Sequence, residues 1–453
     1  MSRNSATATP DDLPPAARFS STREVGEVFQ HFPLTRQHIK ACLALFFVFA
    51  IEAWEMMIIV YTAPLIAKDF ALDALAIGNL ISAMFIGMLI GALAWGKLAE
   101  RIGRKRAILL SLVCYGALSL ASAFAPDYTT LYALRLLSGV AAIGMMVVTF
   151  AHYQELLPVR YRGSLTVYLA SGWPVGMLLA LGATMWLLPM GWRAIIILSS
   201  LASLWALVVV RWVPESPYWL AGRGEQAKAR EVIQRLSGGK FKVPADCELR
   251  VQQDVQGWHR ELFHKAILKI TLLQIVVNFT FSWGYWGLQT WLPTLLQQRG
   301  LSLPQSYGFI ALSALCMIPG YIAAAWLTHR YGRKNIIVIF IGGAVIAGYG
   351  FANAQSLEWL YVSNFALAFF SLGAWGVWGT WIGELYPTRL RTLGYSWAIF
   401  SQRLANVVAP SLIGALITYG TSFNVTTSII NAFMLATMLL AIFIPETEGK
   451  VLR

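Results

Sequence analysis

Long apolar runs separated by short polar segments cover most of the 453-residue chain. Each run is about 20 residues long, which is the length at which an α-helix crosses the hydrocarbon core of a bilayer. Strands of a membrane β-barrel are about half as long, so the runs predict helices. The predicted spans are 38–63, 76–97, 107–125, 128–152, 163–188, 193–212, 266–291, 307–328, 335–353, 358–383, 393–417 and 425–444. The pattern therefore predicts an all-α membrane protein with twelve transmembrane helices.

Polar segments divide these helices into two sets of six. We expect a cytoplasmic N-terminal segment (1–37), an N-terminal six-helix bundle (38–212), a cytoplasmic linker with short helices (213–265), a C-terminal six-helix bundle (266–444) and a cytoplasmic tail (445–453). The linker is the only polar stretch that is long enough for helices of its own.

Composition and charge agree with this division. Hydrophobic residues make up 57% of the chain and charged residues 13%, whereas soluble domains carry about 25% charged residues. The net charge is +13, and nearly all of the 35 Lys and Arg fall in segments on one side of the predicted membrane. The five exceptions are Lys68, Arg135, Arg193, Arg299 and Arg403. This positive-inside bias predicts that both termini are cytoplasmic, and it accounts for the basic balance without a nucleic-acid partner.

The sequence offers little sign of an enzyme or of a metal protein. No nucleophile–base set, phosphate-binding loop or metal-ligand spacing occurs, and the 4 cysteines form no disulfide framework. The polar N-terminus contains no apolar core of a cleaved signal peptide. We therefore expect an integral membrane protein with no catalytic residues, no metal and no cofactor.

The two halves repeat each other in sequence. "GKLAERIGRKRAI" (96–108) matches "AWLTHRYGRKNII" (325–337), and "ELLPVRYRG" (155–163) matches "ELYPTRLRT" (384–392). Both matches have the same offset, because each position of the first copy corresponds to one 229 residues later. A shared offset for two separated motifs indicates two duplicated six-helix halves, related by an axis along the membrane normal.

These motifs resemble the major facilitator superfamily over essentially the whole chain. In that family the loop motif and its repeat hold the cytoplasmic gate through charge contacts. The resemblance implies a cytoplasmic gate built from Gly96, Glu100, Arg101, Gly103, Arg104, Glu155, Arg162, Arg333, Glu384 and Arg391. The sequence departs from the family where Glu100 replaces the usual Asp and where His329 replaces the acid of the second copy. An alternative is that these charges serve only to set the topology.

The second half carries a closer resemblance. "PESPYWL" (214–220) and "PETEG" (445–449) resemble the sugar-porter-like branch of the superfamily. "FTFSWGYWGLQTWLP" (279–293) and "FFSLGAWGVWGTWIGELYPTRLRTLG" (369–394) resemble nicotinate permeases and aromatic-acid/proton symporters. The resemblance implies alternating access driven by a proton gradient, action as a monomer, and a place in a bacterial inner membrane.

Four charges lie inside predicted spans, and none of them recurs in the other half: Glu52, Glu55, Arg135 and Arg403. Charges at membrane depth generally face the interior of a helix bundle and pair there. Glu52 and Glu55 are three residues apart, so they share one helix face. The pair "EAWE" resembles the acidic pair on the first helix of aromatic-acid symporters, and in related porters such an acid pairs with an arginine of the fourth helix. Our hypothesis is that protonation of Glu55, with Glu52, releases Arg135 and couples proton entry to transport; the alternative is a static salt bridge.

Arg403 is the candidate for substrate recognition. Its guanidinium presents a planar fork of donors that suits a carboxylate, and relatives have an arginine in a similar setting. The alternative is an arginine satisfied by backbone carbonyls or by Gln402 and Asn406. Aromatic faces can sandwich a planar ring, and amide side chains can bind its substituents. The expected substrate-binding residues are therefore Arg403, Trp54, Tyr61, Trp173, Gln274, Asn278, Trp283, Tyr285, Trp286, Gln289, Trp375, Trp378, Gln402 and Asn406.

Taken together, the residues and the resemblance predict a secondary active transporter. We expect proton-coupled uptake of a small organic, aromatic monocarboxylate such as nicotinate or a benzoate, with protons, the substrate anion and the lipid bilayer as partners. The alternatives are an antiporter of organic cations or drugs, a sugar porter and a non-transporting ligand sensor. In an antiporter of cations, Glu52 and Glu55 would bind the substrate and Arg403 would be structural.

Overall fold

The computed structural model describes residues 22–30, 33–251, 259–386 and 388–447, and it confirms the predicted helical membrane fold. The first four crossings are α2 (Arg36–Asp69), α3 (Ala74–Ile102), α4 (Arg104–Ala123) and α5 (Tyr128–Leu156). The last six crossings are α13 (Lys265–Gln298), α14 (Leu303–Tyr331), α15 (Arg333–Ala352), α16 (Leu357–Glu384), α17 (Thr388–Thr418) and α18 (Phe423–Ala441).

The fifth and sixth crossings lie in one continuous apolar segment. They are formed by α6 (Arg162–Ala170), α7 (Gly172–Leu187), α8 (Gly191–Leu201) and α9 (Ala206–Trp212), with short 3₁₀ turns at Leu188–Met190 and Ala202–Trp205. Of the candidate spans among the described residues, Tyr168–Trp212 is 45 residues long, roughly twice the length that one crossing needs. Gly191, with φ of 82°, turns the chain back. The break between α6 and α7 lies at Ser171.

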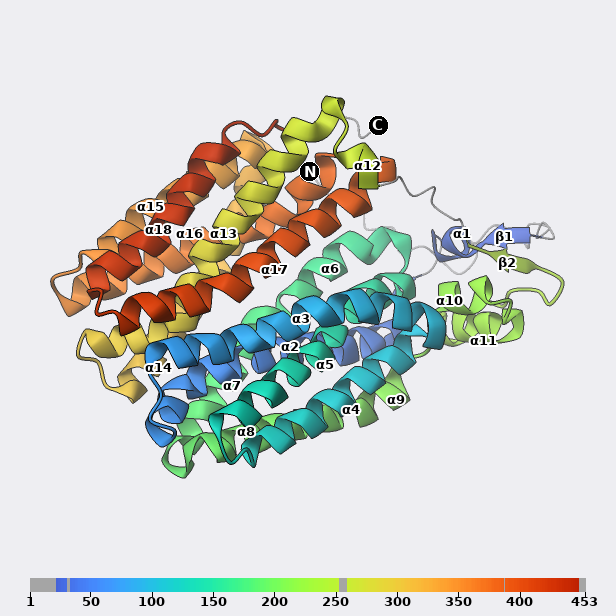
Figure 1. The fold of residues 1–453 in the computed structure, drawn as a ribbon. Coiled ribbons are helices and arrows are strands. Elements are labelled where there is room, and N and C mark those ends of the chain that lie inside the picture. The colour runs from blue at the N-terminus through green and yellow to red at the C-terminus, as the bar shows by residue number, and fades with distance from the viewer. Residues whose placement is uncertain (1–21, 31–32, 252–258, 387, 448–453) are drawn as a thin grey trace, which may run out of the picture.

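The helices form two bundles that lie side by side, one blue to green and the other yellow to red (Figure 1). Within the first bundle α3 packs along α5, and α2 packs along α7. Within the second bundle α16 packs between α14 and α15, and α18 packs against α13 and α15. The loops with Arg101, Arg104, Arg330 and Arg333 lie at one end of the bundles, which we call the basic end.

Glycine lets α3 and α5 approach each other closely. A Cβ atom on Gly87 would lie 1.9 Å from the carbonyl oxygen of Leu136, and one on Gly91 would lie 2.5 Å from that of Val140. Likewise, a Cβ atom on Gly139 of α5 would lie 2.1 Å from the carbonyl oxygen of Met84 on α3. Small residues one turn apart are a common basis of helix association in membranes, so these glycines hold the first bundle together.

The two bundles contact each other mainly at the end opposite the basic loops. There α3 packs along α17, where a Cβ atom on Gly78 would lie 2.4 Å from the Pro410 carbonyl oxygen. Ser411 donates a hydrogen bond to Ser82 at 2.8 Å, and the backbone N–H of Leu75 donates to Thr418 at 2.9 Å. The hydroxyl of Tyr307 on α14 donates to the carbonyl of Tyr61 on α2. The structure is therefore closed at this end, which we call the sealed end.

A small layer covers the basic end of the first bundle (Figure 1). It contains α1 (Val25–Gln30), α10 (Pro217–Gly222), α11 (Gln226–Leu236) and the strands β1 (Thr22–Glu24) and β2 (Glu248–Arg250). The remaining short elements are a 3₁₀ turn (Val159–Tyr161), which follows α5, and α12 (His259–Leu262), which precedes α13. β1 and β2 pair in parallel, with Arg23 opposite Leu249. The short linker helices were expected, but the strands were not, because three-residue strands so far apart carry no periodic signal.

We predict that Gly87→Ala destabilises the first bundle. The new methyl group would meet a backbone carbonyl, so α3 would have to move away from α5. Overpacking of this kind costs about 1–3 kcal/mol, which would appear as a lower midpoint of thermal unfolding in detergent. Gly182→Ala is the control, because a Cβ there meets nothing within 4 Å. An unchanged midpoint for Gly87→Ala would contradict the packing.

Candidate functional site

Glu55 and Arg135 form a buried ion pair inside the first bundle. Nη1 of Arg135 on α5 lies 2.9 Å from Oε1 of Glu55 on α2, and both side chains are completely buried. Ser138 donates a second hydrogen bond to the same carboxylate oxygen, at 3.0 Å. The pairing of these two residues, which the sequence predicted, is present in the structure.

Two serines of α4 complete the surroundings of Arg135. Ser122 accepts hydrogen bonds from Nε at 3.2 Å and from Nη2 at 2.7 Å, and Ser119 accepts one from Nη2 at 3.4 Å. The guanidinium is thus held by α2 and α4 together. Because every partner belongs to the first bundle, this network is internal to that bundle.

Glu52 has different surroundings from Glu55. It is completely buried, and neither carboxylate oxygen has a hydrogen-bond partner among the described residues. The charged groups that act on it electrostatically are Arg403 of the second bundle and Glu55 of its own helix. A buried carboxylate without a hydrogen bond is costly, so this position is a candidate for proton or ligand chemistry.

Arg403 lies at the seam between the bundles. It sits midway along α17 and is 9% exposed. Its Nη2 lies 3.1 Å from the sulfur of Met146 on α5, across the seam. No carboxylate of the described residues lies within 4.0 Å of the Arg403 guanidinium, the distance limit of an ion pair. Glu52 nevertheless interacts with Arg403 electrostatically. Gln402 and Asn406, the amides of the alternative interpretation, do not bind Arg403 in this structure. Gln402 donates a hydrogen bond to Asn278, and Asn406 accepts one from Ser282.

A polar network joins α13, α16 and α17 near Arg403. The Oδ1 atom of Asn278 accepts hydrogen bonds from Gln402 at 2.7 Å and from Trp378 at 2.9 Å. One turn further along, Ser282 donates to Asn406 at 2.6 Å. Gln274 is buried near the same face of α13, and its amide nitrogen has no partner among the described residues. The predicted amides therefore gather on the two helices that flank the seam.

Aromatic rings cross the seam between the bundles. Trp173 of α7 meets Trp286 of α13 edge to face, with ring centroids 5.5 Å apart. Tyr285 continues the row toward the second bundle, with its centroid 5.6 Å from Trp286 and 5.7 Å from Trp375. Phe85, which was not predicted, also contacts Trp286, at 5.4 Å. We call Phe85, Trp173, Tyr285, Trp286 and Trp375 the aromatic cluster.

The structure places three other predicted substrate-binding residues away from this region. Trp54 donates a hydrogen bond to Ser199 of α8, inside the first bundle. Trp283 stacks on Phe433 of α18, with centroids 4.5 Å apart, inside the second. Tyr61 belongs to the sealed end, where its carbonyl binds Tyr307. Helix geometry explains Trp54, because a residue two positions from Glu52 points to the opposite face.

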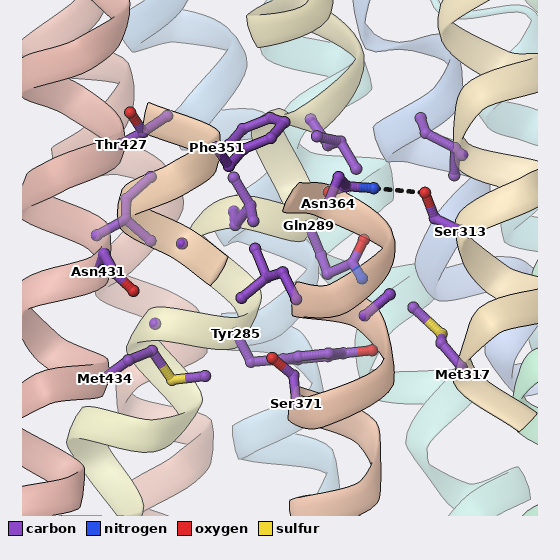
Figure 2. A pocket seen from close by; sticks show the side chains of 18 of the residues that line it. Tyr285, Gln289, Ser313, Met317, Phe351, Asn364, Ser371, Thr427, Asn431 and Met434 are labelled. Atoms are coloured by element: carbon purple, nitrogen blue, oxygen red, sulfur yellow. Dashed lines mark hydrogen bonds between the residues drawn. The ribbon is translucent and has the colours of Figure 1, made fainter. Parts of the chain in front are cut away.

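A small cavity of about 40 Å³ lies inside the second bundle, with one wall residue, Met177, from the first (Figure 2). Tyr285 and Gln289 of α13 point into it, as Figure 2 shows. Asn364 and Ser313 also line the cavity and are hydrogen-bonded to each other at 2.5 Å. Such a polar space can hold water. The amide residues Asn364 and Asn431 of the cavity wall were not predicted from the sequence, because isolated polar residues in a span form no motif.

The predicted gate residues form ion pairs within each bundle at the basic end. Arg104 lies 3.3 Å from Glu155, and Arg333 lies 2.5 Å from Glu384. Each pair is repeated in the other half, as the duplication requires. The loop glycine Gly103 has a φ of 101°, a left-handed conformation that favours glycine. Gly96 has open space around it.

Two carboxylates that the sequence analysis did not name support these pairs. Glu215 accepts hydrogen bonds from the backbone N–H groups of Arg104 and Lys105, at 2.8 and 3.0 Å. Glu446 does the same for Arg333 and Lys334, at 3.0 Å each. Carboxylates at helix N-termini satisfy free N–H groups and the helix dipole. The "PES" and "PET" sequences at the ends of the two halves were the available signal.

The other gate residues make no charge contact between the bundles within the part of the chain that the structure describes. Glu100 is exposed, and its backbone carbonyl accepts a hydrogen bond from Trp219. The Arg101 carbonyl accepts one from Arg223. Nε and Nη2 of Arg391 have no partner among the described residues. Arg162 binds Tyr218 of the linker, not a carboxylate of the second bundle. Among the described residues, no charge contact of the expected gate joins the two bundles at the basic end.

Within the described ranges, no three His, Cys, Asp or Glu side chains come together as a metal site would require. The four cysteines are free thiols. The side chain of His329 lies outside the described residues.

Two like bundles of membrane helices, with buried charges facing a central seam, define the architecture of a membrane transporter. The sequence model described as the Major Facilitator Superfamily matches residues 45–357. The chain is 33% identical to the niacin transporter NiaP of Acinetobacter baylyi, over 88% of this chain and 92% of that protein. The chain therefore belongs to the major facilitator superfamily, whose members are transporters and not enzymes.

Other relatives and structures agree. The chain is 28% identical to the 4-hydroxybenzoate transporter PcaK of Acinetobacter baylyi, over 81% of this chain and 82% of that protein. The partially occluded inward-open xylose transporter XylE of E. coli superposes with a TM-score of 0.76 and 18% identity. The match covers 92% of this chain and 100% of that one, and this similarity shows the fold.

We predict that Glu55→Gln destabilises the protein much more than Glu52→Gln. Removing the Glu55 charge leaves a buried guanidinium without its counter-ion, at a cost of about 3–5 kcal/mol. Glu52→Gln breaks no hydrogen bond. Thermal unfolding in detergent would measure both, with Arg193→Ala as a control, because its pair with Asp69 is half exposed. Equal effects of the two Glu→Gln changes would refute the assignment.

Proposed function

We propose that this protein takes up a small aromatic monocarboxylate together with protons, by alternating access. The observation that carries the proposal is Arg403: a guanidinium midway along α17, at the seam of the bundles, with no carboxylate of the described residues within ion-pair distance. A substrate carboxylate bound to its donor fork would supply the missing counter-charge.

The aromatic cluster supports a planar substrate. Its rings cross the same seam at which Arg403 lies, so a molecule with a carboxylate at one end could reach the guanidinium while its ring contacts Trp173 and Trp286. Edge-to-face and offset contacts of this kind contribute about 0.5–1.5 kcal/mol each. Niacin and 4-hydroxybenzoate, which the names of the relatives specify, are planar aromatic carboxylic acids.

The packing of the bundles supports alternating access. Among the described residues, Ser411–Ser82, Leu75–Thr418 and Tyr307–Tyr61 are hydrogen-bonded between the bundles at the sealed end, and Arg403 contacts Met146 near the middle. With the basic end in the cytoplasm, as the positive-inside rule requires, the site faces inward in this structure. Rocking of the bundles about the central site would open the sealed end and close the basic end.

The geometry favours Glu52 over Glu55 as the group that exchanges the proton. Glu55, Arg135 and their serine partners all belong to one bundle, so their contacts do not change when the bundles move as rigid bodies. Glu52 and Arg403 belong to different bundles, so their interaction changes with the rocking motion. This revises the hypothesis drawn from the sequence, in which protonation of Glu55 releases Arg135.

The charges then couple proton and substrate. As a carboxylate, Glu52 interacts with Arg403 and repels a second anion. When Glu52 takes up a proton, Arg403 is left to bind the substrate carboxylate, so the proton and the anion enter the site together. The proton gradient supplies the driving force, and no cofactor is needed. We further propose that the protein works as a monomer in a bacterial inner membrane with both termini in the cytoplasm.

We predict that aromatic carboxylates stabilise the purified protein through Arg403. Nicotinate and benzoate should raise the midpoint of thermal unfolding, whereas a matched organic cation and a hexose should not. Arg403→Ala should abolish the shift. Arg106→Ala is the control, because Arg106 is exposed on α4. Stabilisation by the cation alone would overturn the proposed substrate class, and a shift retained in Arg403→Ala would overturn the role of Arg403.

We also predict that benzoate binds more tightly at about pH 5.5 than at about pH 7.5. Protonation removes the Glu52 charge, so affinity for the anion should rise as the pH falls. Glu52→Gln, which mimics the protonated acid, should bind tightly at both pH values and lose proton-driven accumulation in vesicles. Glu358→Gln, an exposed acid at the start of α16, is the control. An unchanged pH dependence in Glu52→Gln would refute the coupling role.

A further inference from the structure

The N-terminal segment docks on the cytoplasmic linker through specific contacts. Val25, Val28 and Phe29 of α1 are at most 2% exposed, although the helix has only six residues. β1 pairs with β2 of the linker on one side of α1. After α1, Thr35 donates a hydrogen bond to the carbonyl of Leu236 at 2.6 Å. Residues 22–30 and Thr35 therefore contact the linker through the β1–β2 pairing, the Phe29 ring and the Thr35 hydroxyl.

Tyr218 connects this docked segment to the gate. Its ring contacts Phe29, with centroids 6.0 Å apart, and its hydroxyl accepts a hydrogen bond from Nη2 of Arg162 at 2.6 Å. The guanidinium also lies over the ring, 5.5 Å from its centroid. Nε of Arg162 donates to the carbonyl of Leu157 at 3.1 Å. Arg162, which the family resemblance assigns to the gate, is thus held on its own bundle.

We propose that Tyr218 is a positioning residue that holds Arg162 away from the second bundle, and that the N-terminal segment holds Tyr218 in place. We call the unit of Phe29, Tyr218 and Arg162 the clasp. The clasp stabilises the state in which the basic end is open. To close that end, Arg162 must leave Tyr218 before it can meet the charges of the second bundle.

The inference rests on the alternating-access part of the proposed function, but not on the substrate or the coupling ion. Removing the Tyr218 hydroxyl takes away one hydrogen bond to a charged group. The equilibrium should then shift by about tenfold toward the state that is open at the sealed end. Tyr218→Phe keeps the ring, and therefore keeps the contact with Phe29. Phe29→Ala removes the support of the ring while leaving the hydroxyl.

The test measures how often the sealed end opens. In full-length protein with the four native cysteines replaced by serine, Ser82→Cys places one thiol at the seam, where Ser82 is 3% exposed. The rate of labelling by a membrane-impermeant maleimide reports opening without any substrate. Tyr218→Phe and Phe29→Ala should each increase the rate several-fold. Lys228→Ala, which breaks an exposed ion pair of the linker, should not.

Thermal unfolding distinguishes a role of Tyr218 in positioning Arg162 from a general contribution of Tyr218 to the stability of the fold. The clasp predicts faster labelling in Tyr218→Phe with a nearly unchanged unfolding midpoint. Unchanged labelling in this variant overturns the proposal, whatever happens to the midpoint. If Phe29→Ala does not fold, Phe29→Leu tests the same contact with a smaller change. Failure of Arg403→Ala to affect anion binding would overturn the proposed role of Arg403 while leaving this result intact.

Discussion

The cost of a charge in a medium without water governs the centre of this structure. Arg135 meets that cost with a carboxylate and two serine hydroxyls of α4. Glu52 and Arg403 do not, since neither has an ion-pair partner within hydrogen-bond distance among the described residues. The contacts of Arg135 are complete inside one bundle, whereas the interaction between Glu52 and Arg403 depends on the position of one bundle relative to the other. The fixed ion pair and the movable charge therefore belong to two neighbouring carboxylates of α2, Glu55 and Glu52.

The duplication makes this separation easier to see. The features that recur in both halves, such as Arg104 with Glu155 and Arg333 with Glu384, stabilise each bundle. Each intramembrane charge, in contrast, occurs in one half and has no counterpart at the equivalent position of the other half. Two copies of one bundle thus share a scaffold, while the residues of the central site differ between them.

Sequence reasoning predicted the twelve crossings, the two halves and the pair of Glu55 with Arg135, because long periodicity, a repeat offset and charge burial are visible in the sequence. It did not separate Glu52 from Glu55, because the seam is defined by the second bundle and not by α2. It placed Trp54 in the site, although the 100° step of a helix turns that residue away from Glu52. It also missed the pairing of Arg23 with Leu249, which depends on how the two ends of the first half meet in space.

The caps formed by Glu215 and Glu446 have a topological consequence. Each half ends by returning to the start of its own third helix, so the chain of each half closes into a loop held by a carboxylate and backbone N–H groups. A unit closed in this way fixes its own ends. The polypeptide that joins the two units then carries no tension between them, so its length is free to vary without altering either bundle.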